Sequence, residues 1–198
     1  MDIVSRVQNI LLKPKDEWVK IKGESTPPMQ LIMTYALFLA AIPAVALLIG
    51  SAIIGYGYGV KLQFASALFY AIALFVVSLA ATYAFGIIIN ALAPNFGGKP
   101  NLQKAMQLAV YSMTPVWIAG ILNIIPSLAM LGSLLGLYGL FILYLGFNTP
   151  LMDTPKDKQM THLIVSIVCM VVLQLIVYYV LRAIFLSGAH LSVGNFKF

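Results

Sequence analysis

Charge is what this sequence has least of. Only 9% of its residues are Asp, Glu, Lys or Arg, against about 25% in a typical soluble domain. Hydrophobic residues make up 61% of the chain, and the mean hydropathy is +0.95. Because so little charge is available to face water, the composition predicts an integral membrane protein.

Cysteine and histidine are almost absent. Cys169 is the single cysteine and cannot form an internal disulfide, and we expect both histidines, His162 and His190, at the membrane interface or outside it. No Cys/His cluster has zinc spacing. A membrane hydrolase needs a nucleophile with a base, paired carboxylates or a metal. The sequence therefore predicts a protein that is not an enzyme and has no cofactor or metal site.

Carboxylates are missing from every long apolar run of the chain. Ionisable groups inside a bilayer mark proton relays and ion paths, so their absence argues against a pump or an ion-coupled transporter. The net charge is +6, yet the basic residues form no block with interleaved aromatics. This pattern predicts no nucleic-acid partner.

Five apolar stretches are long enough to cross a bilayer, which takes about 20 residues. They run from 29 to 54, 64 to 93, 104 to 125, 127 to 147 and 162 to 186. The loops between them are GYGYG (55–59), PNFGGKPN (94–101), the reversal at Pro126, and NTPLMDTPKDKQMT (148–161). The predicted fold is an all-α bundle of five transmembrane helices, with an N-terminal segment (1–28) and a short external tail (187–198). A re-entrant hairpin formed by the third and fourth stretches is the alternative.

The distribution of Lys and Arg predicts the orientation. With the N-terminus in the cytoplasm, the inner segments hold nine of the twelve basic residues, and Lys61, Arg182 and Lys197 lie outside. This excess fits the positive-inside rule. The C-terminus is then external.

Two short amphipathic helices precede the first span. Residues 2–12 place apolar side chains on one helical face, with Asp2 as N-cap. The second helix begins at Pro14, carries Trp18 and Ile21 on one face and ends at Gly23. A tryptophan flanked by lysines suits a helix in the headgroup layer, so we expect a cytoplasmic collar beneath the bundle. The collar is either a topology anchor or a docking surface for a soluble protein.

A layer of small, polar and helix-breaking residues lies near the middle of the spans. Pro115 should kink the third span, because it cannot donate to the Tyr111 carbonyl, and Ser112, Thr114 or a neighbouring helix can satisfy the freed backbone. We expect Gln174 to hydrogen-bond across helices. The layer is either structural or the lining of a pocket for a lipid or small solute. Its members are Pro43, Ser78, Tyr111, Ser112, Thr114, Pro115, Gly136 and Gln174.

Glycines are concentrated in the fourth span. Gly132 and Gly136 form a GxxxG motif, and Gly139 and Gly146 form a second pair of small residues. Such surfaces allow close helix approach. They predict either packing within the chain, against the third span, or association of two copies into a homo-oligomer.

Three motifs together resemble the Yip family of Ypt/Rab-GTPase-interacting membrane proteins, in its bacterial branch. LLKPKDEWVKI (11–21) resembles the family's Pro-x-x-x-Trp-x-x-Ile segment, and YSMTPVW (111–117) resembles its Gly-Tyr-Ser-x-x-Pro signature, with Val110 in place of the glycine. GLYGLFILYLGF (136–147) is similar to the end of the family's fourth span. The long N-terminal region and the Asp-Leu-Tyr-Gly-Pro motif of eukaryotic members are absent.

This resemblance implies an organiser or adaptor in a bacterial inner membrane. Its partners would be the lipid bilayer and a protein recruited at the N-terminal segment. The alternative is a transporter or channel that carries a small solute or lipid through the polar layer.

Overall fold

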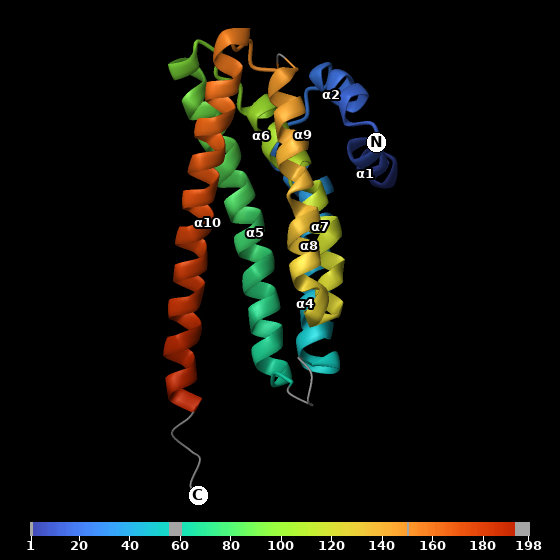
Figure 1. Ribbon diagram of the computed structural model, residues 1–198, viewed down its shortest axis with the longest axis vertical. Helices are drawn as coiled ribbons and strands as arrows, with labels where there is room; N and C mark the ends of the chain where they lie inside the picture. Colours follow the sequence, from blue (N-terminus) through green and yellow to red (C-terminus); the bar gives the residue numbers. More distant parts are fainter. Residues whose placement is uncertain (1, 56–60, 150, 193–198) are drawn as a thin grey trace, which may run out of the picture.

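The computed structural model describes residues 2–55, 61–149 and 151–192 (Figure 1). Within these ranges the chain forms helices and their connections. The helices are α1 (Ile3–Leu12), α2 (Pro14–Lys22), α3 (Pro28–Leu31), η1 (Ile32–Ala36), α4 (Leu37–Ile49), η2 (Gly50–Ile54), α5 (Phe64–Leu92), η3 (Ala93–Phe96), α6 (Leu102–Ser112), α7 (Thr114–Ala119), η4 (Gly120–Ile124), η5 (Pro126–Leu128), α8 (Ala129–Gly136), α9 (Tyr138–Asn148) and α10 (Lys156–Ser192).

Five helical stretches are long and apolar enough to cross a membrane, which confirms the predicted five-helix architecture. They are Pro28–Ile54, Phe64–Phe96, Leu102–Ile124, Pro126–Asn148 and Lys156–Val177. The third and fourth each contain 23 residues, or about 35 Å of helix, which is enough for a full crossing. Of the predicted loop at 55–59, only Gly55 lies within the described residues.

The fifth helix differs from its prediction at both ends. It begins at Lys156, six residues before His162, and the backbone amides of Lys158 and Gln159 bond to the Pro155 carbonyl. Asp157 in its first turn faces the positive end of the helix dipole. The helix also continues to Ser192, beyond the predicted boundary at 186, and the rest of the predicted tail lies outside the described residues.

The third span is the most buried of the five. It packs against α4 and α5 on one side and against α8 and α9 on the other, while α10 packs on α5 and α9. The span breaks at Met113, between α6 and α7, and Pro115 lies in the first turn of α7. The predicted interruption of this helix is therefore confirmed.

The N-terminal helices lie against the flank of the bundle, near the end where α6 begins and α9 ends (Figure 1). This corrects the expected position beneath the bundle. The Asp2 side chain caps α1 by accepting from the Val4 and Ser5 amides at 3.2 and 3.1 Å, as predicted. Hydrogen bonds from Ser5 and Val4 lower the pKa of the Asp2 carboxyl. The far end of α10 lies at the opposite end of the molecule (Figure 1).

Candidate functional site

Trp18 joins the N-terminal helices to the bundle. Its indole is 1% exposed, its Nε1 donates to the Ile142 carbonyl at 3.0 Å, and its ring meets Tyr111 edge-on at 6.2 Å. Gly146 makes room for the ring, because a β-carbon there would lie 2.8 Å from Trp18 Cζ2. The three segments that carry the family resemblance thus meet at one point.

Burial of Trp18 and Ile21 changes how the N-terminal segment is interpreted. Ile21 is 0% exposed and Pro14 is half-buried at the start of α2. Trp18 and Ile21 contact the bundle, so neither side chain is exposed to the headgroups or to a soluble partner. Docking of a protein stays a prediction for the exposed side chains of α1 and α2.

A network of buried ion pairs connects these two helices. Arg6 is 2% exposed and its Nη1 donates to Glu17 Oε1 at 2.6 Å, while its Nη2 donates to Glu24. The guanidinium carbon also lies 5.4 Å from the centre of the Tyr111 ring. A buried charge is costly unless it is paired and hydrogen-bonded, and both conditions are met here. Arg6 therefore ties α1 and α2 to each other and to the third span.

Lys104 and Gln107 of α6 hold the end of α2. The Lys104 ammonium donates to the Ile21, Lys22 and Glu24 carbonyls at 3.1, 2.7 and 2.6 Å, and the Gln107 amide donates to Glu24 O at 3.3 Å. The last carbonyls of a helix carry partial negative charge and lack partners within the helix. A cation from a different span satisfies them here.

Tyr111 also contacts Tyr35 of the first span. Its ring lies 5.1 Å from the Tyr35 ring, edge to face, and the Tyr35 hydroxyl is hydrogen-bonded to Thr114 Oγ1 at 2.9 Å. Of the groups predicted to be able to satisfy the backbone freed by Pro115, Thr114 has its hydroxyl paired with Tyr35. Tyr111, Thr114 and Pro115 thus belong to the buried core of the third span.

A large cavity with a volume of about 710 Å³ lies on another side of the third span. It lies between α5 and α10 on one side and α7, α8 and α9 on the other. Five predicted members of the polar layer lie on its wall: Pro43, Ser78, Ser112, Gly136 and Gln174.

Hydrogen bonding of this layer only partly matches the prediction. Ser78 Oγ accepts from Trp117 Nε1 at 3.0 Å. Ser112 Oγ is buried and has no partner among the described residues. Gln174 is exposed on α10, and no hydrogen bond of its side chain is found within the described part of the chain. The expected bond from Gln174 across helices is therefore not formed, because its side chain lies at the cavity rather than against a neighbouring helix.

The glycines of the fourth span are used for packing within the chain. A β-carbon at Gly132 would come within 2.9 Å of the Ala119 carbonyl oxygen, and one at Gly139 within 2.5 Å of the Ser112 carbonyl oxygen. Gly136 faces Val116 at 3.4 Å. Of the two predicted roles, the structure shows packing against the third span. A homo-oligomer stays a prediction, and it would have to use other faces.

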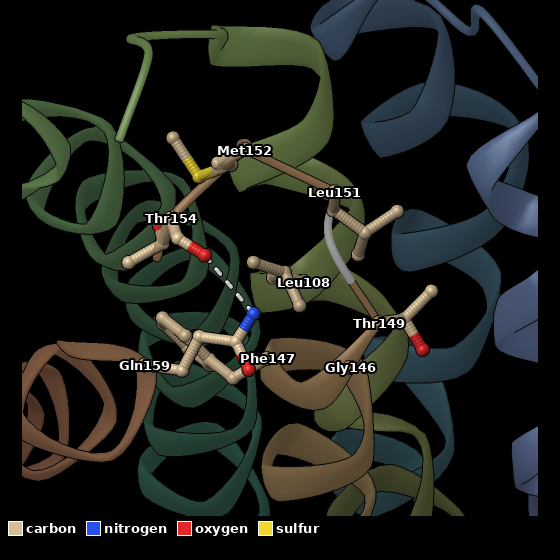
Figure 2. Close-up of a pocket in the computed structure, with 8 residues that line it drawn as sticks. All are labelled: Leu108, Gly146, Phe147, Thr149, Leu151, Met152, Thr154 and Gln159. Atoms are coloured by element: carbon tan, nitrogen blue, oxygen red, sulfur yellow. Dashed lines mark hydrogen bonds between the residues drawn. The ribbon is translucent and has the colours of Figure 1, made fainter. Parts of the chain in front are cut away.

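A much smaller cavity lies between Leu108, Gly146, Phe147 and Gln159 (Figure 2). Its volume of about 10 Å³ is at the lower limit for a single water molecule. Gln159 Nε2, drawn with its bond in Figure 2, donates to the Thr154 carbonyl at 3.0 Å. This cavity can hold no larger ligand.

His162 is 0% exposed, stacked on Phe96 at 5.0 Å and in edge contact with Phe147 at 4.9 Å. Its Nε2 lies 3.2 Å from the Ile89 carbonyl oxygen. The ring is buried because these three residues of neighbouring elements surround it. Phe96 and Phe147 lie at or beside the ends of their spans, so the position of His162 at the interface stays a prediction.

Arg6, Glu17, Glu24 and Lys104 are the residues that sequence reasoning missed. Arg6 lies on the polar face of a short amphipathic helix, where an arginine is normally solvated. No spacing in the sequence connects it to Tyr111. The concentration of acidic residues within and just after α2 was the only available signal.

Comparison with known proteins gives one family and two relatives. The model of the family described as the Yip1 domain matches residues 9–179. Inner membrane protein YohC of Escherichia coli strain K12 is 29% identical over 150 residues, covering 72% of this chain and 77% of that protein. The protein of the same name from Escherichia coli O6:H1 strain CFT073 matches equally well. No solved structure gives a significant match.

Proposed function

Because the chain belongs to the Yip1 domain family, we propose that it is a non-enzymatic organiser of the membrane that contains it. The proposed location is a bacterial inner membrane, because the relative from Escherichia coli is named inner membrane protein YohC. The proposed orientation places α1 and α2 in the cytoplasm, because it agrees with the positive-inside rule. That end of the molecule carries nine of the twelve basic residues.

The observation that carries this proposal is the fixed position of α1 and α2. Trp18 and the Arg6 network hold both helices against the third and fourth spans. Their outward side presents apolar and basic side chains together: Val4, Leu12 and Val19 are 61%, 78% and 68% exposed, and Lys13 and Lys15 lie beside them. A rigid surface of this kind matches an anionic headgroup layer, to which apolar and basic side chains both bind.

Within the described part of the spans, carboxylates are confined to the first turn of α10. Of the six acidic residues of the sequence, four lie before the first span, Asp153 lies in the loop before α10, and Asp157 lies in the first turn of α10. His162, the histidine whose side chain the structure describes, is enclosed by aromatic rings and a backbone carbonyl. We therefore extend the proposal to a role without covalent chemistry.

Hydrogen exchange in nanodiscs of defined lipid tests the organiser role. Exchange at residues 12–20 should be slower in discs containing phosphatidylglycerol than in discs of phosphatidylcholine alone. The variant Leu12→Ser/Lys13→Ser/Lys15→Ser should lose this difference, whereas Lys61→Ser at the opposite end should keep it. Equal exchange in the two lipids would contradict the proposal, and protection that required an added soluble protein would favour the adaptor role.

Labelling tests the orientation separately. With Cys169 replaced by serine, a cysteine introduced at Lys15 should react only from the cytoplasmic side and one at Lys61 only from the outside. The reverse pattern would overturn the orientation.

A second candidate function is passage of a small solute or lipid through the bundle. It is favoured by the cavity of about 710 Å³ and by the position of Gln174 on its wall. Under this proposal Gln174→Leu abolishes flux or ligand binding and leaves the yield of folded protein unchanged. A variant that retained full flux would contradict it.

A further inference from the structure

The large cavity is bounded by membrane-spanning helices on every side for which lining residues are known. Its walls come from α4, α5, the end of α6, α7, η4, α8, α9 and α10, within the five spans. The medium around these helices is therefore lipid, and acyl chains are the molecules present at the highest concentration next to the cavity.

Its size requires an occupant. About 710 Å³ falls within the range of roughly 300–1,000 Å³ found for ligand pockets. Protein interiors are close-packed, and atoms that line an empty space lose their dispersion contacts on that side. Most of the lining side chains are apolar, and cavities lined by apolar groups stay dry. The polar ones, Ser78, Ser112, Asn123, Ser133 and Gln174, can hydrogen-bond single waters but leave the apolar part of the wall without a partner.

The residues that line the cavity favour an uncharged occupant. No Asp, Glu, Lys, Arg or His is among the described residues that line the cavity. The indole N–H of Trp117 is already bonded to Ser78, and Gly136 and Gly139 add no polar side chain to the wall. A phosphate, carboxylate or cation would have no charged partner there, whereas a hydrocarbon chain needs none.

We propose that this cavity is a binding site for one acyl chain of a bilayer phospholipid. The chain lies between α5 and α10 on one side and α7 and α8 on the other, and it contacts the otherwise buried third span beside Trp117. This inference is independent of the organiser role, since it requires neither the N-terminal helices nor a partner.

Photo-crosslinking with a phosphatidylethanolamine that carries a diazirine in its acyl chain tests the site. In nanodiscs containing this lipid, crosslinks should map to residues 112–120 of the third span. Crosslinks at Trp117, which is 1% exposed, are the ones that report the cavity, because Val116 in the same segment is 37% exposed and can also be reached by lipid around the bundle.

Two neighbouring valines give a matched pair of variants. Val171 and Val172 are 51% and 50% exposed on α10, and only Val171 lines the cavity. Val171→Phe fills the space of about two methylenes, so crosslinking at Trp117 should fall about tenfold. Val172→Phe should leave it unchanged. Leu140→Phe, from the facing wall, is a second filling variant should Val171→Phe fold poorly.

The outcomes separate cleanly. Crosslinks confined to outward-facing residues such as Ile72, or an equal loss in the Val171 and Val172 variants, would overturn the proposal. Crosslinks at Trp117 that Val171→Phe and Leu140→Phe suppress and Val172→Phe does not would support it. Either result is obtained without measuring transport or headgroup binding.

Discussion

Gly146 lies directly against the six-membered edge of the Trp18 indole, so that any β-carbon at position 146 would come within 2.8 Å of Trp18 Cζ2 and 2.6 Å of Leu108 Cδ2. Position 18 is in the N-terminal segment and position 146 is near the end of the fourth span. The docking of α2 on the bundle thus depends on the absence of a side chain far away in the sequence.

Gly146→Ala is expected to displace Trp18. Overpacking of this kind costs about 1–3 kcal/mol, and the displaced indole should show red-shifted, more quenchable fluorescence. Thermal unfolding in detergent and iodide quenching would measure the two effects. Gly23→Ala is the control, because a β-carbon there meets only the Lys20 carbonyl oxygen at 3.4 Å. Unchanged fluorescence in Gly146→Ala would contradict the packing described.

The glycines of the fourth span should differ in their tolerance of alanine. Gly139→Ala places a methyl group 2.5 Å from the Ser112 carbonyl oxygen, which is backbone and cannot move aside, whereas Gly136→Ala meets a Val116 methyl at 3.4 Å. We expect Gly139→Ala to lose about 1–3 kcal/mol and Gly136→Ala to be near neutral. Unfolding in mixed micelles would compare them, and equal losses would count against packing on the third span.

Arg6→Met should release the N-terminal helices, because it removes the buried partner of the Glu17 carboxylate and leaves it paired with the exposed Lys20 ammonium. Removing one member of a buried ion pair costs about 3–5 kcal/mol, which should appear as faster hydrogen exchange at residues 3–24 with the spans unaffected. The double variant Arg6→Met/Glu17→Met should recover part of the loss.

Lys20→Met is the matched control for this network. Lys20 Nζ also pairs with Glu17, at 3.2 Å, but its side chain is 64% exposed. Exposed pairs contribute about 0–1 kcal/mol, so exchange should change little. If Lys20→Met changed exchange as much as Arg6→Met, burial would not be the reason that the Arg6–Glu17 pair stabilises the N-terminal helices.

The Asp2 cap should make the start of α1 sensitive to acid. Its pKa is lowered in the folded protein by hydrogen bonds from Ser5 and Val4, so its contribution is complete above the unfolded value and is lost as pH falls through the folded one. Amide exchange at Val4 and Ser5 should therefore rise only below pH 3.8, the ordinary pKa of an aspartate carboxyl. Asp2→Asn should remove this pH dependence, and a midpoint above that value would contradict the assigned cap.

Much of the local structure followed from local rules. The Asp2 cap, the start of α2 at Pro14 and the break before Pro115 each depend on a few neighbouring residues. The extra turns at the start of α10 were missed, because Lys156 to Thr161 are polar and hydropathy does not distinguish a polar helix end from a loop.

Partners across the bundle could not be predicted. The residues that neighbour Trp18 and Arg6 in the sequence suit a position in the headgroup layer equally well. The residues around Gln174 suit a hydrogen bond between helices. Which partner each finds depends on the angle and spacing of helices that are distant in the chain.

By itself the sequence determined how often this chain crosses the membrane and where its charge lies. Each span must be apolar and must satisfy its own backbone as a helix, whatever its neighbours do. Only the tertiary structure decided which side chains face lipid, which face protein, and where space is left between them. Those outcomes depend on the fit between separate helices, since in hydrocarbon it is packing and hydrogen bonding, rather than hydrophobicity, that distinguish one arrangement from another.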